Sequence, residues 1–381
     1  MRVKYMVWLG LGGLMVAPVC AGEVELLRTP QDGLQPQAVV DAQGVLHVIY
    51  FQGEPAGGDL FYTRRLPEAS TWSAPLRVNR RPATAVAVGT IRGGQLALGK
   101  NGRLHVVWNG RQKAASDNPR QAPLFYTRMN RAGDGFEPER NVITYAFGLD
   151  GGSSVAADPQ GNVYVVWHAP LPGRKGEAGR AVFVARSTDE GKTFAREEAV
   201  NPPASGVCPC CGLKALADHA GRVFILYRTA RELSHRDMTL LVSTDGGQPF
   251  QAIYAHPWTV FTCPMSSASL AESRAGLVAA WETQQQVYWS WIQPGETKVA
   301  DPVAPSGSGN RKHPSVAVNT QGEVLLAWTE GTGWAKGGFL EWQVFDRDGH
   351  PISQKHRVAG LAAWSMPAAV ARPNGNFVIV Y

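Results

Sequence analysis

The chain has 381 residues, of which 44% are hydrophobic and 18% charged, and its formal net charge is +6. This length would ordinarily suggest two or three domains unless a repetitive fold absorbs it. Arginine and lysine are scattered between acidic residues, and no basic stripe carries interleaved aromatic residues, so the composition argues against nucleic-acid binding.

The first 21 residues have the pattern of an export signal. Basic residues precede an apolar run over residues 6–19, and Val19-Cys20-Ala21 offers small residues for cleavage before Gly22. The run is too short to span a membrane, so we expect no transmembrane segment in the mature chain. Lipid attachment at Cys20 is disfavoured, because the preceding residues fit that signal poorly. We therefore expect a periplasmic or secreted protein of a bacterial-type envelope, with a net charge of +4 (6 − 2) after cleavage.

One pattern recurs through residues 22–381: an apolar stretch, a polar turn that closes on glycine, and an alternating strand that ends in Trp or Tyr. Alternation with a period of two predicts a β-hairpin in each copy. Repeated copies of one unit indicate stacked supersecondary elements. The turn glycines are Gly44, Gly102, Gly161, Gly221, Gly276, Gly322 and Gly375.

A further apolar segment follows each of the first six hairpins, and a shorter one leads into the next hairpin. Four strands per repeat predict a propeller blade. The seventh copy ends at Tyr381 after two strands, and residues 24–27 form a spare strand. We predict an all-β propeller of seven four-stranded blades, one monomeric domain closed by its N-terminal strand. Six blades remain the alternative if two partial blades merge.

Two polar turns between expected third and fourth strands carry a specific motif. Residues 187–194 read Ser-Thr-Asp-Glu-Gly-Lys-Thr-Phe, and residues 243–250 are a second copy with Pro249 in place of Thr. Both resemble the Asp-box of the sialidase superfamily. The resemblance implies a propeller fold and a structural role for the turn residues, not catalysis. These residues are Ser187, Asp189, Gly191, Thr193 and Phe194, and Ser243, Asp245, Gly247 and Phe250.

For a sialidase, the resemblance also implies three arginines that clamp a carboxylate, a Tyr nucleophile backed by Glu, and an Asp acid/base. The early Arg-Ile-Pro motif is missing, and its nearest counterpart is Thr-Ile-Arg-Gly-Gly at residues 90–94. Surface ion pairing is the alternative role for every candidate, since none sits in a diagnostic pattern. The candidates are Arg92, Arg228, Arg231, Asp150, Glu282 and Glu330.

The most unusual chemistry lies in Cys208-Pro209-Cys210-Cys211. Cys208 and Cys263 each precede the turn glycine of their copy by thirteen residues (221 − 208 and 276 − 263), so they occupy equivalent places in adjacent blades. In an exported protein we expect a bridge between Cys263 and Cys208 or Cys211. A soft-metal site for copper or zinc is the alternative, and redox exchange by a labile bridge is a third.

Other chemically suitable residues are expected at the same mouth of the central channel as the cysteines. His168, Met265, His313 and Met366 are the candidate additional ligands, and Trp334 interrupts the register of the repeat in a glycine-rich loop. We expect a binding protein that recognises a carbohydrate or protein ligand at this mouth. An exo-glycosidase of the sialidase type that acts on acidic sugars and an envelope metal-handling protein are the alternatives.

Overall fold

The computed structural model describes residues 22–89, 91–111, 122–232, 234–293 and 299–381. The expected signal segment and Cys20 lie outside the described residues. The described chain is built of β-strands, with two short 3-10 helices, η1 (Pro30–Asp32) and η2 (Lys100–Gly102). No helix in these ranges is long and apolar enough to cross a membrane.

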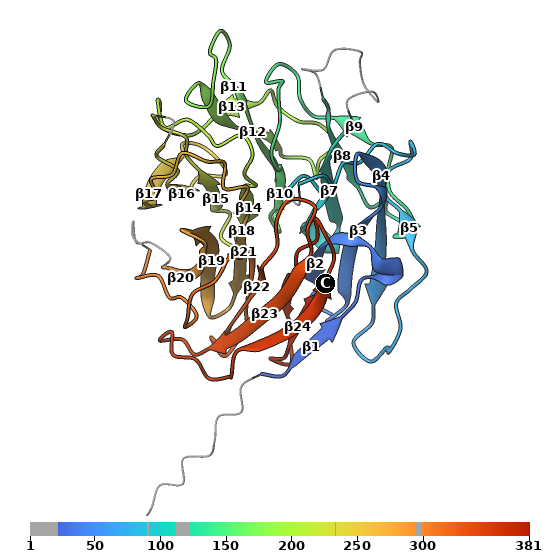
Figure 1. Ribbon diagram of the computed structural model, residues 1–381. Coiled ribbons are helices and arrows are strands. Elements are labelled where there is room, and N and C mark those ends of the chain that lie inside the picture. The colour runs from blue at the N-terminus through green and yellow to red at the C-terminus, as the bar shows by residue number, and fades with distance from the viewer. Residues whose placement is uncertain (1–21, 90, 112–121, 233, 294–298) are drawn as a thin grey trace, which may run out of the picture.

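The strands form seven sheets arranged as the blades of a propeller (Figure 1). Blades 1 to 3 are β2 (Leu34–Val40), β3 (Leu46–Glu54), β4 (Gly57–Arg65) and β5 (Leu76–Arg77); β6 (Gln95–Leu98), β7 (Leu104–Asn109), β8 (Leu124–Arg128) and β9 (Arg140–Asn141); and β10 (Ser154–Ala157), β11 (Val163–Pro170), β12 (Arg180–Ser187) and β13 (Glu198–Ala199).

Blades 4 to 6 are β14 (Lys214–Ala217), β15 (Val223–Arg228), β16 (Met238–Ser243) and β17 (Gln251–His256); β18 (Ala268–Ser273), β19 (Gly276–Thr283) and β20 (Gln286–Ile292); and β21 (Arg311–Val318), β22 (Val324–Glu330), β23 (Gly338–Phe345) and β24 (His356–Leu361). In blade 5 the fourth strand is reduced to single bridges from Trp289 to Val303 and from Ile292 to Val299.

Blade 7 confirms the expected closure of the ring. It combines β25 (Ala368–Ala371) and β26 (Phe377–Val380) with the N-terminal strand β1 (Val24–Leu27), which pairs with β26 in parallel. In Figure 1 the blue and red ends of the chain meet at this seam. The seven-bladed all-β prediction is therefore confirmed, and the six-bladed alternative is wrong.

The turn chemistry explains why each copy begins as a hairpin. At Gly161 the backbone has φ +101°, and the Asp158 carboxylate accepts the amide hydrogens of Gly161 and Asn162 at 2.9 and 2.8 Å. Glycine reaches such φ values without a Cβ clash, while aspartate satisfies the free turn amides. All seven turn glycines have positive φ.

The aromatic residues at the strand ends pack between the blades. Trp108, Trp167, Trp281 and Trp328 are fully buried, as are Tyr50 and Tyr227. Their burial supplies much of the hydrophobic stabilisation, at about 25 cal/mol per Å² of apolar area. These residues are thus part of the core rather than a surface for ligands.

The turn over residues 187–194 is held by its own polar side chains. Ser187 Oγ accepts the Gly191 amide at 2.8 Å, and Asp189 accepts both the amide and the hydroxyl of Thr193 at 2.9 and 2.7 Å. Phe194 packs edge-on against Tyr126 of the neighbouring blade at 4.9 Å. In the second turn, the Gly247 amide donates to Ser243 Oγ at 3.1 Å.

One lysine crosses the central channel. Lys214 begins β14 in blade 4, and its ammonium donates to Gln37 Oε1 on β2 at 3.2 Å and Gln95 Oε1 on β6 at 3.1 Å. Burial lowers the pKa of Lys214 to about 8. The inner strands of blades 1, 2 and 4 are therefore linked through one buried cation.

Candidate functional site

The cysteine-bearing end of the propeller is formed by the segments that lead into the innermost strands, and we call it the cysteine face. The Glu190 amide donates a hydrogen bond of 2.9 Å to the carbonyl of Gly161. This places the turn over residues 187–194 beside the β10–β11 turn, at the end of the propeller opposite the cysteine face. The Cys208 amide instead donates a hydrogen bond of 2.9 Å to the carbonyl of Arg228, the last residue of β15, so Cys208 lies at the end of the blade where β15 ends. The two features lie on opposite faces, as expected from the alternation of the strands.

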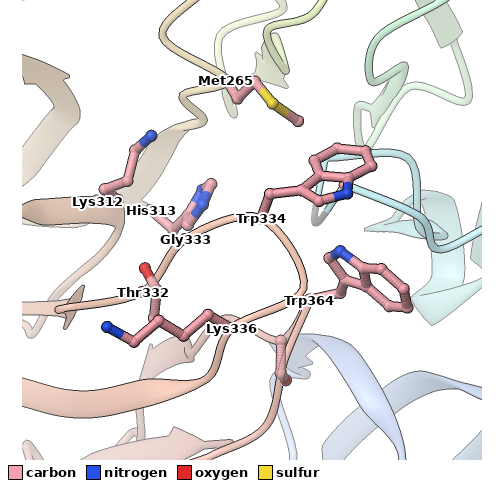
Figure 2. Close-up of a pocket in the computed structure, with 10 residues that line it drawn as sticks. Met265, Lys312, His313, Thr332, Gly333, Trp334, Lys336 and Trp364 are labelled. Carbon is pink, nitrogen blue, oxygen red and sulfur yellow. The ribbon is translucent and has the colours of Figure 1, made fainter.

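The cysteine face contains a pocket with two tryptophans (Figure 2). Figure 2 shows the indoles of Trp334 and Trp364 side by side, with Met265 above them and Lys312, His313 and Lys336 across from them. The two rings are 6.3 Å apart between centroids and meet edge to face at 73°. Trp334 is 60% exposed, which is unusual for so large an apolar side chain. The remaining lining residues are Gly89, Thr332, Gly333 and Ser365.

The pocket carries positive charge. Two of its lining residues are lysines and none is acidic. Lys312 donates to the carbonyl of Pro264 at 2.6 Å, while Lys336 lies on the exposed loop beside Trp334. Burial and the charge of Lys312 lower the pKa of His313 to about 3, so its ring is neutral and shares a hydrogen bond with Ser267 at 3.2 Å. The pocket therefore favours an anionic group next to an apolar surface.

The backbone of this pocket is strained. Met265, His313 and Trp364 have φ values of 49°, 50° and 60°, in the left-handed region that L-residues rarely adopt. Each such residue costs roughly 1–2 kcal/mol. Gln35, at φ 51°, is also left-handed, and its side-chain amide donates to the carbonyl of Trp364 at 2.8 Å. Strain of this kind persists where the surrounding contacts hold it, and it concentrates at functional sites.

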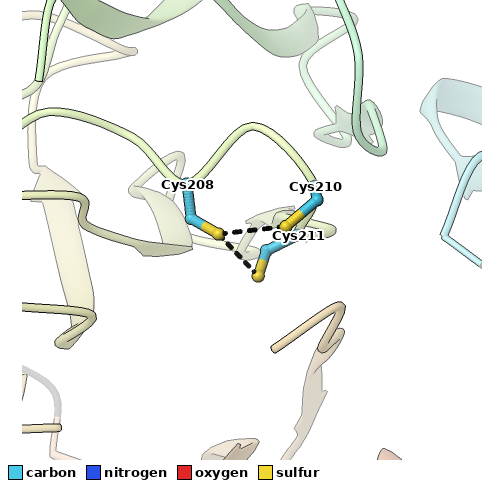
Figure 3. A group of neighbouring side chains, drawn as sticks. All are labelled: Cys208, Cys210 and Cys211. Atoms are coloured by element: carbon cyan, nitrogen blue, oxygen red, sulfur yellow. Dashed lines mark hydrogen bonds between the residues drawn. The ribbon is translucent and has the colours of Figure 1, made fainter. Parts of the chain in front are cut away.

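The cysteines form a disulfide and a neighbouring dithiol. Cys210 is bonded to Cys263, so the bridge joins the segments before blades 4 and 5. The expected pairing with Cys208 or Cys211 is wrong. Those two thiols are free and buried, and their sulfurs lie 3.0 Å apart. Figure 3 shows the Cys208 sulfur facing the sulfurs of both Cys210 and Cys211, and it lies 3.5 Å from that of Cys210.

The two free thiols have different electrostatic surroundings. The hydrogen bond with Cys211 and then burial raise the pKa of Cys208. Burial also acts to raise the pKa of Cys211, but the hydrogen bond with Cys208 and the charge of Arg228 lower it to about 6. Ser266 donates a hydrogen bond to Cys211 Sγ at 3.6 Å. The two thiols therefore titrate as one hydrogen-bonded pair that carries a single negative charge.

The residues present do not fit a four-ligand zinc site. Such a site needs four ligands, and two of the four cysteines are consumed by their bond to each other. His168 accepts a hydrogen bond from Arg180 at 3.2 Å, and His313 is engaged with Ser267. Met265 lines the tryptophan pocket, and the buried cluster around the sulfurs contains Ala230 but not Met366. Within the described ranges, none of the four additional candidates forms a hydrogen bond with a cysteine sulfur.

The candidate arginines are occupied by separate partners. Arg92 pairs with Asp150 at 2.6 Å and Arg231 with Asp237 at 3.4 Å. Arg228 is buried and donates to Ser266 Oγ at 2.9 Å, to the carbonyl of Arg236 at 2.6 Å and to the carbonyl of Glu282. The structure therefore assigns the three cations to different networks rather than to one carboxylate clamp.

The candidate carboxylates also differ in their surroundings. Glu330 pairs with the buried Arg311 at 3.3 Å. Glu282 is buried, and one of its carboxylate oxygens has no hydrogen-bond partner among the described residues. Burial raises the pKa of Glu282 to about 7, against the opposing charges of Lys312 and Arg228. Glu282 is thus a buried acid with one carboxylate oxygen that lacks a hydrogen-bond partner among the described residues.

Sequence reasoning singled out Trp334 but missed Trp364, Lys312 and Lys336. A signal for Trp364 was present: it precedes its turn glycine by eleven residues (375 − 364), as Met265 does (276 − 265). Met265 and Trp364 thus occupy equivalent positions in two copies of the repeat, and both line the same pocket. The lysines carry no comparable signal, because isolated lysines are common on any surface.

Comparisons with solved structures support the propeller fold of sialidases and arabinanases. The Hadza microbial sialidase Hz136 is 12% identical, with a TM-score of 0.50 over 82% of this chain and 65% of that one. The NanB sialidase of Streptococcus pneumoniae is 7% identical, with a TM-score of 0.51 over 86% of this chain and 68% of that one. The chain thus spans about two thirds of the length of these sialidases.

The alpha-L-arabinanase of Penicillium chrysogenum is 14% identical, with a TM-score of 0.51 over 86% of this chain and 98% of that one. No protein-family model and no curated protein sequence matches the chain. Similarity at this level of identity establishes a shared fold, and the fold alone does not assign a substrate.

Proposed function

We propose that this chain is an exported sialidase-like propeller that binds an acidic carbohydrate through the tryptophan pocket of the cysteine face. The observation that carries the proposal is the pair Trp334 and Trp364 beside Lys312 and Lys336, in a lining without acidic residues. An indole offers a flat apolar face to a sugar ring, and an ammonium group attracts a carboxylate. The strained backbone supports a preformed site, which reduces the ordering that binding requires.

Binding rather than hydrolysis is the better-supported function. An exo-sialidase would need three free arginines around one carboxylate, and each of Arg92, Arg228 and Arg231 is engaged elsewhere. The sialidase and arabinanase neighbours support a propeller of the glycosidase kind. We further infer that the turns over residues 187–194 and 243–250 are Asp-boxes with a structural role, and that residues 1–21 direct export.

Calorimetric titration of the mature protein with N-acetylneuraminic acid and with galacturonic acid oligosaccharides tests the proposal. We expect saturable binding that weakens with added salt, since exposed charge pairs are screened, and little binding of neutral galactose oligosaccharides. Trp334→Ala and Lys336→Gln should each reduce affinity about tenfold, which corresponds to about 1.4 kcal/mol.

Phe261→Ala is the matched control, because Phe261 is 84% exposed but does not line the pocket. Equal binding by all three variants, or equal binding of acidic and neutral sugars, would contradict the proposed site.

A further inference from the structure

We propose that Cys208, Cys210, Cys211 and Cys263 form a thiol–disulfide relay, in which a buried dithiol exchanges with a disulfide at the surface. This activity is separate from carbohydrate recognition at the tryptophan pocket. It would make the chain a redox partner for external thiols or disulfides that reach the cysteine face.

The two sulfur pairs differ in their access to solvent. Cys263 is exposed and Cys210 is half-buried, so their disulfide is open to reagents in solution. Cys208 and Cys211 are 0% and 2% exposed, and they remain thiols in contact with each other. The molecule therefore keeps a reducing pair inside and an oxidised pair outside, and the two pairs are adjacent.

The buried dithiol and the surface disulfide meet in the turn over residues 208–211. Cys208 Sγ lies 3.5 Å from Cys210 Sγ and 3.0 Å from Cys211 Sγ (Figure 3). The turn is closed by the Cys211 amide, which donates to the Cys208 carbonyl at 3.4 Å. Exchange requires a thiolate to attack a disulfide sulfur, and Cys208 is placed to attack Cys210.

Neighbouring polar groups stabilise a negative charge on the buried sulfurs. Arg228 Nε donates to Ser266 Oγ at 2.9 Å, and that hydroxyl in turn donates to Cys211 Sγ at 3.6 Å. A guanidinium and a hydroxyl near a sulfur stabilise its thiolate. Arg228 and Ser266 thus stabilise a negative charge on the dithiol, and transfer of the shared proton across the 3.0 Å contact between the two sulfurs moves that charge from Cys211 to Cys208 when Cys208 becomes the nucleophile.

The exchange balances without an added oxidant or reductant. Cys208 gives its proton to the Cys211 thiolate and attacks Cys210, the Cys210–Cys263 bond breaks, and Cys263 leaves as a thiolate. Cys211 then attacks Cys208, the Cys208–Cys210 bond breaks, and Cys210 leaves with the proton. One disulfide has moved inside, and a thiol and a thiolate have appeared at the surface, where they can reduce an external disulfide by the same chemistry.

The test is a pulse of N-ethylmaleimide on the native mature protein, purified without reductant. The protein is then unfolded, its disulfides are reduced, and the released thiols are labelled with isotopically heavy N-ethylmaleimide. We expect the light label to accumulate on Cys263 and Cys210, and the heavy label on Cys208 and Cys211.

Two variants separate the steps of the relay. Cys208→Ser should lower light labelling of Cys263 at least tenfold, since it removes the attacking sulfur. Cys211→Ser stops the second step and slows the first, because it removes the thiolate that accepts the proton of Cys208. Cys263 should therefore be labelled more slowly than in the wild type, and Cys210 should not be labelled. Wild-type protein that takes light label only on Cys208 and Cys211, or takes none, would overturn the relay without a variant. Unchanged labelling of Cys263 in folded Cys208→Ser would do the same.

Discussion

The backbone amide of Phe377 donates a hydrogen bond to the carbonyl oxygen of Glu23 at 2.7 Å. The Tyr381 amide similarly donates to Leu27 at 3.0 Å, so the first strand of the described chain is held by the last. Val24 and Leu26 of β1 pack into the apolar cluster around Phe377 and Ile379. A propeller whose final blade has only two strands of its own is completed in this way.

Removing residues 22–27 should therefore open the ring. The deletion removes the β1–β26 hydrogen bonds, at about 1 kcal/mol each, and the packing of two apolar side chains, at roughly 1.5–3 kcal/mol each when fully buried. We expect a loss on the order of 5 kcal/mol in the free energy of unfolding, measured by urea denaturation. Protein that lacks only residues 1–21 is the control, and equal stability of the two forms would contradict closure by β1.

Replacing Gly191, in the turn over residues 187–194, by alanine should destabilise the protein more than the same change at Gly173. Both have left-handed φ values, 76° and 73°, so Ala costs about 1 kcal/mol at either position from the backbone alone. A Cβ at Gly191 would also collide with the Tyr126 hydroxyl, whereas one at Gly173 meets nothing within 4 Å. We expect Gly191→Ala to lose roughly 1–3 kcal/mol more than Gly173→Ala in urea denaturation. Equal losses would show that the interblade contact gives way freely.

The buried acid Glu282 should make stability depend on pH. Its pKa is about 7 in the folded protein against 4.5 for the ordinary group, so between these values the folded state binds more protons than the unfolded state. Wild-type protein should lose up to about 3 kcal/mol, relative to Glu282→Gln, as pH rises from 4.5 to 7. Urea denaturation at several pH values measures the difference, with the exposed Glu54→Gln as control. A constant difference between wild type and Glu282→Gln would rule out this titration.

Gly22, the first residue after the expected cleavage site, gives a test of export. The Gly22 nitrogen lies 3.1 Å from Glu323 Oε2, and a Cβ at Gly22 would approach the carbonyl of Gly375 at 2.6 Å. Cleavage after Ala21 would turn this amide into an ammonium group paired with the carboxylate. We expect N-terminal sequencing of protein from the periplasm or medium of a bacterial host to begin at Gly22. A full-length chain that remains in the cytoplasm would contradict the signal.

The repeat made the fold predictable from the sequence. Turn glycines such as Gly44 and Gly161 mark positions where φ is positive, and the alternation after them fixes which side chains face the neighbouring blade. The spare strand at residues 24–27 was predictable for the same reason, because the seventh copy lacked an outer strand. Periodic features of this kind do not depend on distant contacts.

The cysteine pairing was not predictable, because it depends on one tight turn. Cys208 and Cys263 are equivalent in the repeat, yet the hydrogen bond that the Cys208 amide donates to the carbonyl of Arg228 holds Cys208 inside. The turn over residues 208–211 then leaves Cys210, not Cys208, bonded to Cys263. The burial of Arg228 was not predictable either, because nothing in the sequence distinguishes an isolated buried arginine from an exposed one.

Lys214 has a consequence for how the blades of the ring are held together. Because its side chain reaches from one blade to the inner strands of two others, it connects blades that are not neighbours in the ring. Blade 4 is therefore coupled to blades 1 and 2 directly, and not only through the blades that lie between them in the ring.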